Sequence, residues 1–396
     1  MSDFAATREM FHLPDGMIYL DGNSLGPLPK AATERVGASM AAEWGDMLIT
    51  GWNKAGWMDL PQQLGDRIAG LIGAEAGSVV VGDTLSLRVY QALGAALAMT
   101  PRRIVLSDRG NFPSDLYMAQ GLLQSLGGEY ALRVVEPEEV ESALSDDVAV
   151  LMLTEVDYRT GRKHDMARLT RLAQARGIVT IWDLAHSAGA IEVDLAGSGA
   201  DFAVGCSYKY LNGGPGAPAF IYVAPRHSDT AHTVLNGWLG HEAPFAFEPD
   251  YRPGGGIARM RIGTPAILQM RALEAALDIW DMVEMTDIRA ASIALTERFI
   301  AGVEAACPDL VLASPRDPDL RGSQVSFRFE HGYAAMQALI ARGVVGDFRA
   351  PDIMRFGFTP LFIGDAEVDA AVSHIGDIMQ NRLWDRPEFH ARQAVT

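Results

Sequence analysis

Residues 202–216 read Phe-Ala-Val-Gly-Cys-Ser-Tyr-Lys-Tyr-Leu-Asn-Gly-Gly-Pro-Gly, an apolar run that leads directly into a lysine and a glycine-rich turn. A short, continuous apolar run is typical of a strand buried on both faces of a parallel sheet. Lys209 follows this run, although an unpaired lysine is among the least favoured residues to bury. A desolvated lysine is a nucleophile that can bond covalently to a carbonyl. The stretch therefore indicates a chemical role for Lys209, the alternative being a surface lysine on the turn.

The segments on both sides of this stretch alternate between short β-rich runs and helical patterns. The other predicted strands cover residues 78–81, 103–107, 148–154, 178–182 and 219–223. The predicted helices between them cover residues 85–99, 115–125 and 166–175. This alternation predicts a mainly parallel sheet, of the seven-stranded kind, with helices on both faces.

Beyond Arg261 the pattern changes to that of a smaller α+β module. A helical pattern covers residues 266–285 and is predicted to bridge to this module. The module has predicted strands at 324–329, 344–348 and 353–356, and predicted helices after 287, at 334–341 and from 365. The expected organisation is a large domain at 46–285, a small domain at 286–396, and residues 1–45 packing with the small domain.

Composition excludes several classes of protein. The chain has 396 residues, and 33 Lys and Arg against 50 Asp and Glu give a net charge of −17, which argues against nucleic-acid binding. Cys206 and Cys307 form no CxxC pair, so neither a disulfide framework nor a structural zinc site is expected. The first ten residues lack the apolar core of a secretory signal, and no 18-residue apolar segment occurs. We therefore expect a cytoplasmic protein without a membrane or metal partner.

Polar residues gather where the predicted strands end, which is where ligands bind in open α/β sheets. Asp183 ends the strand before Lys209, with His186 three residues on, and a buried carboxylate suits a protonated ring nitrogen. The alternative is a helix N-cap, since residues 184–190 could form a helix. Asp183 is therefore a candidate partner for a cationic heterocycle.

Two further segments could hold an anion and a flat ring. Ser86 lies at a predicted helix start, where free N–H groups favour an anion, although a simple helix cap is the alternative. Phe112 precedes Pro113, Ser114 and Asp115 after the next strand, where its ring could stack on a ligand; a proline-containing turn is the alternative. A reactive lysine, a carboxylate, an anion site and a stacking ring together predict a pyridoxal phosphate (PLP) site.

Seven short segments together resemble the kynureninases, a family of fold-type I PLP enzymes in the aminotransferase class V group. They are Asp21–Gly26, Phe112–Asp115, Asp157–Gly161, Trp182–His186, Cys206–Asn212, Gly237–Trp238 and Arg355–Leu361. The resemblance extends from about residue 15 to about residue 380. It implies the hydrolysis of L-kynurenine to anthranilate and L-alanine in tryptophan catabolism, by a homodimer with its active sites at the subunit interface.

The resemblance also implies roles for individual residues. The expected catalytic and cofactor-binding residues are Lys209 as the covalent cofactor lysine, Asp183 as the pyridinium partner and Tyr208 as a proton relay. The other expected cofactor contacts are Leu85, Ser86, Phe112, Ser114, Asp115, Thr154, His186, Trp238 and Thr264. The expected substrate contacts are Arg355 for the α-carboxylate, which suits its planar fork, and Asn23, Trp57 and Thr264.

Two positions depart from the family pattern. Arg88 stands where an Asn is expected after the phosphate-site hydroxyl, and Thr264 stands where some relatives have Asn. A short Thr, together with Trp52 or Trp57 in the ring pocket, would leave a 3-hydroxyl on the substrate without a full partner. We therefore expect L-kynurenine to be preferred over its 3-hydroxy form, although both tryptophans could instead be core residues.

Two alternative functions involve the same site. An aminotransferase of the same group would use the same lysine and aspartate, whereas a cysteine desulfurase needs a mobile nucleophilic cysteine. Neither Cys206 in a predicted buried strand nor Cys307 before Pro308 suits that role. The third alternative is a PLP-fold protein that only binds a ligand, against which the presence of Lys209, Asp183 and Arg355 argues.

Overall fold

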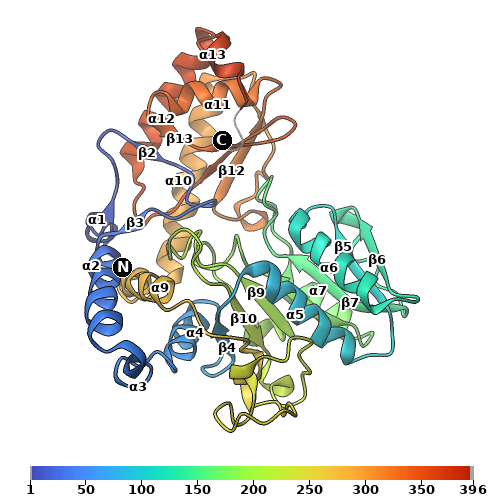
Figure 1. The fold of residues 1–396 in the computed structure, drawn as a ribbon. Coiled ribbons are helices and arrows are strands. Elements are labelled where there is room, and N and C mark those ends of the chain that lie inside the picture. Colours follow the sequence, from blue (N-terminus) through green and yellow to red (C-terminus); the bar gives the residue numbers. More distant parts are fainter. Residues whose placement is uncertain (1, 393–396) are drawn as a thin grey trace.

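The computed structural model describes residues 2–392 and contains a seven-stranded sheet with a smaller module beside it (Figure 1). The strands of the large sheet lie in the order β4 (Val79–Val81), β10 (Phe220–Val223), β9 (Phe202–Gly205), β8 (Val179–Asp183), β7 (Val148–Thr154), β5 (Ile104–Asp108) and β6 (Ala131–Val135). β10 is antiparallel to both of its neighbours, and the other neighbouring pairs are parallel. The predicted, mainly parallel sheet is confirmed.

Helices cover both faces of this sheet, which explains why its strands are continuous apolar runs. One face is covered by α5 (Leu85–Ala98) and α6 (Pro113–Leu126). The other face is covered by α4 (Leu60–Leu71), α7 (Met166–Gln174), α8 (Leu195–Ser198) and α9 (Ile267–Trp280). Along β7, Val150 and Met152 belong to the first core and Leu151 and Leu153 to the second. Alternate side chains of one strand therefore serve two cores.

The small module, at the top of Figure 1, combines an antiparallel sheet with helices. Its strands lie in the order β11 (Val311–Leu312), β12 (Gln324–Arg328), β15 (Ile353–Gly357) and β14 (Asp347–Arg349). Its helices are α10 (Met285–Ala306), α11 (Gly332–Ile340), α12 (Asp365–Gln380) and α13 (Pro387–His390). Within residues 2–392, no helix is both long enough and apolar enough to cross a membrane.

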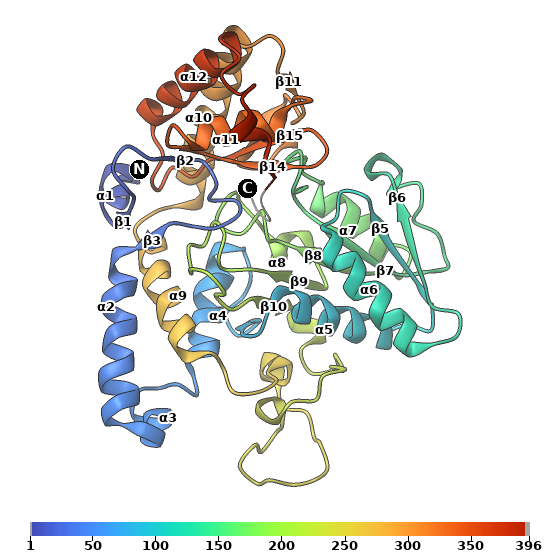
Figure 2. The same ribbon diagram turned by 45° about the horizontal axis from the view of Figure 1, so that its top comes forward.

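The N-terminal segment reaches from the small module to the side of α9, as Figure 2 shows. Its elements are α1 (Phe4–Glu9), β1 (Phe11–His12), β2 (Ile18–Tyr19), β3 (Leu28–Pro29), α2 (Lys30–Ala38) and α3 (Gly51–Lys54). β2 pairs in parallel with β13 (Val344–Val345) of the small module. In the other direction, α2 packs against α9. This segment therefore contacts both the small module and the helix α9 beside the large sheet.

The structure differs from the sequence prediction at three places. β6 was not predicted, because its residues are only partly buried at the sheet edge and include Arg133. The single strand predicted at 344–348 is wrong: Gly346 separates β13 from β14, which belong to different sheets. A Cβ at Gly346 would lie 2.8 Å from the Arg355 carbonyl oxygen, so only glycine fits the break. Residues 184–190 form turns rather than a helix.

Candidate functional site

Lys209 lies in the turn after β9, with its ammonium facing a histidine. Its Nζ is 3.0 Å from His186 Nε2 and 5.8 Å from the ring centroids of both Phe112 and Tyr208. Burial, and then the charge of Lys209, lower the pKa of His186 well below its ordinary value. The imidazole is therefore neutral, so Nε2 accepts a hydrogen bond from the ammonium.

Two buried carboxyl groups lie on the other side of this lysine. Asp183 is the last residue of β8, and its Oδ1 accepts a hydrogen bond of 2.8 Å from the backbone N–H of Ala185. Burial raises the pKa of Asp183 to about 6, an effect that the charge of Lys209 opposes. Burial and the charge of Asp183 raise the pKa of Asp115 well above its ordinary value. Of the two carboxyl groups, Asp115 therefore holds a proton more strongly than Asp183.

The starts of α5 and α6 meet and form a site suited to an anion. The Oγ atoms of Ser86 and Ser114 are 3.0 Å apart, and each lies in the first turn of its helix. The capping role belongs to Thr84, whose hydroxyl accepts from the N–H of Leu87. The N–H groups at a helix start have no partner within the helix and attract anions. Ser86 is therefore not the cap of α5, and its hydroxyl can serve a ligand.

Phe112 and Thr154 adjoin the anion site and the carboxyl pair, respectively. Phe112 directly precedes α6, and 40% of its side chain is exposed, unlike the core aromatic residues. Its ring meets the ring of Tyr158 edge-on, with centroids 5.1 Å apart. Thr154 ends β7 directly beside Asp183. An exposed aromatic face is thus available to a flat ligand at the carboxyl edge of the sheet.

Arg355, on β15, approaches the site from the small module and is almost fully oriented by neighbours. Its Nε donates to Asp347 Oδ1 at 2.7 Å, and its Nη2 donates to Asp347 Oδ2 and, at 2.7 Å, to Ser24 Oγ. Its Nη1 donates to the carbonyl oxygen of Tyr158 at 2.6 Å. These contacts use four of the five N–H groups of a guanidinium. One N–H of Nη1 remains for a ligand, and Arg349 lies 2.7 Å from the same Asp347 carboxylate.

The N-terminal loop closes the gap between Lys209 and Arg355. The N–H of Gly26 donates to the carbonyl oxygen of Tyr208 at 2.8 Å, and a Cβ at Gly26 would lie 2.6 Å from the Lys209 carbonyl oxygen. Asn23 packs against Gly357, two residues beyond Arg355. Both polar atoms of its buried amide lack a hydrogen-bond partner among residues 2–392, so they are available to a ligand.

Three of the predicted contacts, Trp57, Trp238 and Thr264, have interactions that do not involve the Lys209 side chain. Trp57 is buried, donates its indole N–H to Glu43 at 2.7 Å and packs against Trp52. Trp238 contacts the rings of Phe245 and Phe247 and donates its N–H to the Pro244 carbonyl. Thr264 is exposed and lines a cavity beside Thr84 and Arg88. Within residues 2–392, none of the three forms a hydrogen bond or a ring contact with the Lys209 side chain.

The prediction missed Asp347, Ser24 and Tyr158, which hold Arg355. Asp347 is the informative omission, because it lies two residues before Arg349 on the same strand. Side chains two residues apart in a strand point to the same face, so an Asp-x-Arg run signals a shared ionic site. Ser24 and Tyr158 lie in loops, for which periodicity carries no such information.

Comparison with known proteins gives the family of the chain. A kynureninase from Burkholderia pseudomallei strain 1106a is 50% identical over 400 residues, covering 99% of this chain and 96% of the relative. The chain belongs to the kynureninase family. The family description "Kynureninase C-terminal domain" matches residues 288–375, most of the small module of this kynureninase-family chain. The resemblance seen in the sequence is confirmed.

Solved structures of other proteins share the fold of this kynureninase-family chain. A cysteine desulfurase from Thermococcus onnurineus NA1 superimposes with a TM-score of 0.79 at 18% identity, over 95% of this chain and 98% of that chain. A C-DES variant with glycine linked to its PLP cofactor gives a TM-score of 0.81 at 17% identity, over 93% and 99%. At such identity the likeness concerns the fold alone. The predicted fold-type I architecture is confirmed.

Proposed function

We propose that this protein hydrolyses the Cβ–Cγ bond of L-kynurenine, producing anthranilate and L-alanine, with PLP as its cofactor. The observation that carries the proposal is the 50% identity to a kynureninase over 99% of the chain. The grouping of Lys209 and Asp183 at the carboxyl ends of neighbouring strands, with Arg355 approaching from the small module, supports it. The expected catalytic residues stay as predicted: Lys209, Asp183 and Tyr208.

The residues present fit PLP in each of its parts. Lys209 is the amine for its aldehyde, and the charged Asp183 is the partner for its ring nitrogen. Phe112 offers the stacking face, and Leu85, Ser86 and Ser114 at the paired helix starts would hold the phosphate. Bound PLP supplies a cationic ring that withdraws electrons from the substrate Cα. Thr154, His186 and Asp115 complete the proposed cofactor contacts.

Lys209 and Tyr208 would move the protons of the first and last steps of the hydrolysis, and Lys209 would return its proton to Cα after the Cβ–Cγ bond has broken. The Nζ of Lys209, once released, removes the proton from the substrate Cα as a general base. Asp183 keeps the ring nitrogen protonated while charge develops. A water oxygen then adds to the γ-carbonyl carbon, the Cβ–Cγ bond breaks, and anthranilate leaves. Neighbouring Cys206 and burial raise the pKa of the Tyr208 hydroxyl, which therefore stays protonated and can deliver the proton that Cβ needs to give alanine.

Product analysis tests the proposed function directly. Purified protein supplied with PLP and L-kynurenine is expected to release anthranilate and alanine in equal amounts, with no need for a second amino-group acceptor. An amino-group transfer would instead need an α-keto acid and would leave the Cβ–Cγ bond intact. Absence of anthranilate from the fully loaded protein would contradict the proposal.

A desulfurase activity is the alternative that the fold itself raises, since a desulfurase shares this architecture. Such an enzyme needs an accessible cysteine thiolate. Both cysteines of this chain are buried, and burial raises the pKa of each thiol. The side chains therefore favour the hydrolase over the desulfurase.

Arg355→Lys is expected to raise the KM for L-kynurenine by about 10-fold or more, because a lost hydrogen bond to a charged group costs about 1.5 to 3 kcal/mol. Arg355 is the proposed contact of the α-carboxylate, with Asn23 beside it, and a lysine cannot reproduce the orientation that Asp347 imposes on the guanidinium. Steady-state kinetics give the measurement. Arg349→Lys is the matched control, and a larger effect there would move the carboxylate site to Arg349.

L-kynurenine is expected to have a kcat/KM at least about fivefold higher than that of 3-hydroxy-L-kynurenine. We propose Thr264 and Trp57 as ring-pocket residues; the indole N–H groups of Trp57 and Trp238 are already donated to Glu43 and Pro244. A 3-hydroxyl would therefore lose water without gaining a full partner. A direct competition assay measures the ratio. Equal or reversed preference would contradict this account of the ring pocket.

A homodimer with its active sites at the subunit interface is the proposed assembly. Trp238 and Thr264, which lie apart from Lys209 in one chain, would reach the site of the partner chain. The helical turns after α2 support an interface, because they expose four large apolar side chains: Met40, Trp44, Leu48 and Ile49. Light scattering in solution is expected to give about twice the chain mass of 42.7 kDa. A single-chain mass for active enzyme would contradict the shared site.

Two further features belong to the proposal. The proposed domain division is 1–45, 46–285 and 286–396, supported by the pairing of β2 with β13 of the small module. The proposed location is the cytoplasm, supported by the two unpaired cysteines, which suit a reducing compartment.

A further inference from the structure

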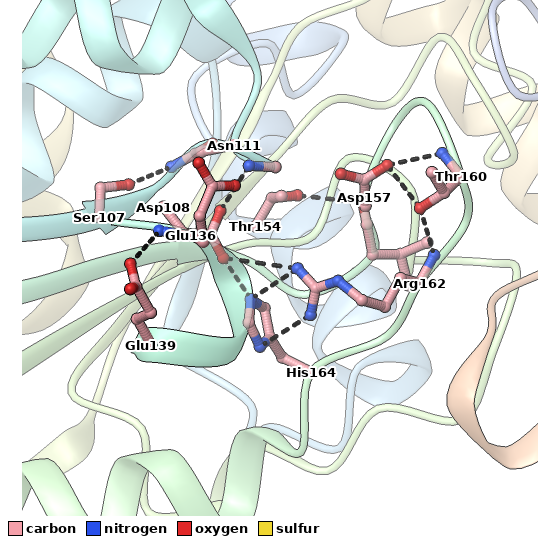
Figure 3. A network of polar contacts seen from close by, with 12 residues as sticks. Ser107, Asp108, Asn111, Glu136, Glu139, Thr154, Asp157, Thr160, Arg162 and His164 are labelled. Atoms are coloured by element: carbon pink, nitrogen blue, oxygen red, sulfur yellow. Dashed lines mark hydrogen bonds and ion pairs between the residues drawn. The ribbon is translucent and has the colours of Figure 1, made fainter. Parts of the chain in front are cut away.

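A buried charged cluster lies beside the proposed cofactor site and takes no part in the chemistry described above (Figure 3). Asp108 ends β5, and its fully buried carboxylate is 2.6 Å from His164 Nε2 and 3.5 Å from Arg162 Nη2. Arg162 Nη1 is 3.2 Å from His164 Nδ1. Arg162 Nη2 is also 3.1 Å from His164 Nε2, so the guanidinium lies against both ring nitrogens. His164 therefore links a buried carboxylate to a guanidinium.

This cluster fastens a hairpin, residues 156–163, to the loop that follows β5. The hairpin is closed by an antiparallel bridge between Val156 and Lys163 and by a 2.8 Å bond from the N–H of Asp157 to the Arg162 carbonyl. Arg162 and His164 at its base are the residues that reach Asp108. The fit is tight, because a Cβ at Gly110 would lie 2.6 Å from Asp157 Oδ2 and 3.2 Å from Arg162 Nη2.

The two loops joined in this way carry residues that contact or orient the groups of the proposed site. In the first loop, the amide oxygen of Asn111 accepts from the N–H of Phe112 at 2.7 Å, and its Nδ2 donates to Ser107 Oγ at 3.1 Å. In the hairpin, Tyr158 accepts from Arg355 through its carbonyl and meets the Phe112 ring with its own ring. The position of the hairpin therefore determines how far Arg355 lies from Phe112.

We propose that Asp108, Arg162 and His164 form a positioning cluster that sets the spacing between the cofactor-stacking ring of Phe112 and the carboxylate-binding Arg355. The inference rests on the proposed function, because those two roles come from it. The cluster touches neither the cofactor nor the substrate, and it acts through the hairpin. Disrupting the cluster would displace both Phe112 and Arg355. A displacement of about 1 Å at a reacting site costs up to about 100-fold in rate.

His164→Ala is expected to raise both the dissociation constant for PLP and the KM for L-kynurenine by about tenfold or more. Cofactor affinity is measured by titrating the cofactor-free protein with PLP and following its absorbance, and KM by steady-state kinetics. His164→Gln is expected to restore both constants to within a few-fold of wild type, since its amide can donate to Asp108 and accept from Arg162. Rescue by glutamine separates positioning from the need for an ionisable ring.

The chain contains a matched control at the other end of the strands of the large sheet, away from the end at which Asp108 lies. His227 Nε2 lies 2.8 Å from Asp201 Oδ1, which also pairs with Arg226, so the same three residue types meet there. His227→Ala is expected to lower Tm while leaving the PLP dissociation constant and KM unchanged. If His227→Ala changed them as much as His164→Ala, general destabilisation would explain the result and the proposal would be overturned.

A second variant tests the same spacing without removing a side chain of the cluster. Gly110→Ala places a Cβ against Asp157 Oδ2 and pushes the hairpin away, so it is expected to raise the same two constants even if His164→Ala fails to fold. Unchanged constants in the folded variants would overturn the cluster's role. If the wild-type protein did not cleave kynurenine, the proposed function would fail on its own, while the PLP titrations would still test the link to Phe112.

Discussion

Lys209→Ala is expected to abolish turnover and to leave PLP bound only non-covalently. Within residues 2–392, the Nζ of Lys209 is the one amine facing both His186 and the ring of Phe112, so it is expected to be the covalent anchor and the general base. The Ser86 and Ser114 hydroxyls and the helix starts remain in the variant, so the phosphate contact survives. The measurement is kynurenine turnover, together with dialysis to compare the retention of PLP.

Hydride reduction followed by peptide mapping supplies the positive identification. The chain has only four lysines, at positions 30, 54, 163 and 209, so the labelled peptide identifies the anchor without ambiguity. Lys163→Ala is the matched control and should keep both the label and the activity. A pyridoxyl label on any lysine other than Lys209 would refute the assignment.

Asp183→Asn is expected to lower kcat by at least about 100-fold, equivalent to about 2.7 kcal/mol in the activation free energy. The amide has almost the shape of the carboxylate and can still accept from the N–H of Ala185, so the turn after β8 is preserved. It has no charge with which to hold a proton on the ring nitrogen. Single-turnover kinetics at saturating kynurenine measure the loss. Activity within a few-fold of wild type would limit Asp183 to a structural role.

The same substitution in the cofactor-free protein gives a control for folding. The pKa of Asp183 is raised to about 6 by burial, so its charged form destabilises the folded state. A carboxyl with a raised pKa contributes stability at low pH that is lost as the pH rises through that value. The asparagine variant should therefore have the higher Tm at pH 8, and the difference should shrink toward pH 4. A lower Tm at every pH would attribute the kinetic loss to damage.

The parallel sheet was predictable because its central strands are short apolar runs, of which β5, β7 and β8 end in a polar residue. Burial on both faces imposes that pattern, and the lysine and aspartate stand out against it. The orientation of β10 was not predictable in the same way, because an antiparallel strand inside a two-sided core has the same composition as a parallel one. β6 was not predicted because it is an edge strand, whose partly buried residues need not form an apolar run.

Site residues were predictable where their type is unfavourable at a buried position. They were unpredictable where only their three-dimensional contacts bring them to the site. Lys209 and Asp183 are costly to bury, so their positions signal chemistry. Asp347 and Tyr158 hold Arg355 through a side-chain pair and a backbone carbonyl, and a carbonyl carries no sequence signal. The separation of Trp238 and Thr264 from Lys209 is likewise a property of the three-dimensional arrangement alone.

The N-terminal loop has a consequence for how the enzyme is made in the cell. Ser24 donates to Asp347 across 323 positions of sequence, and β2 pairs with β13 at a comparable separation. This N-terminal loop must therefore wait, unpaired, until the segment around Asp347 has been translated. The site around Arg355, which needs both segments, cannot be completed before then.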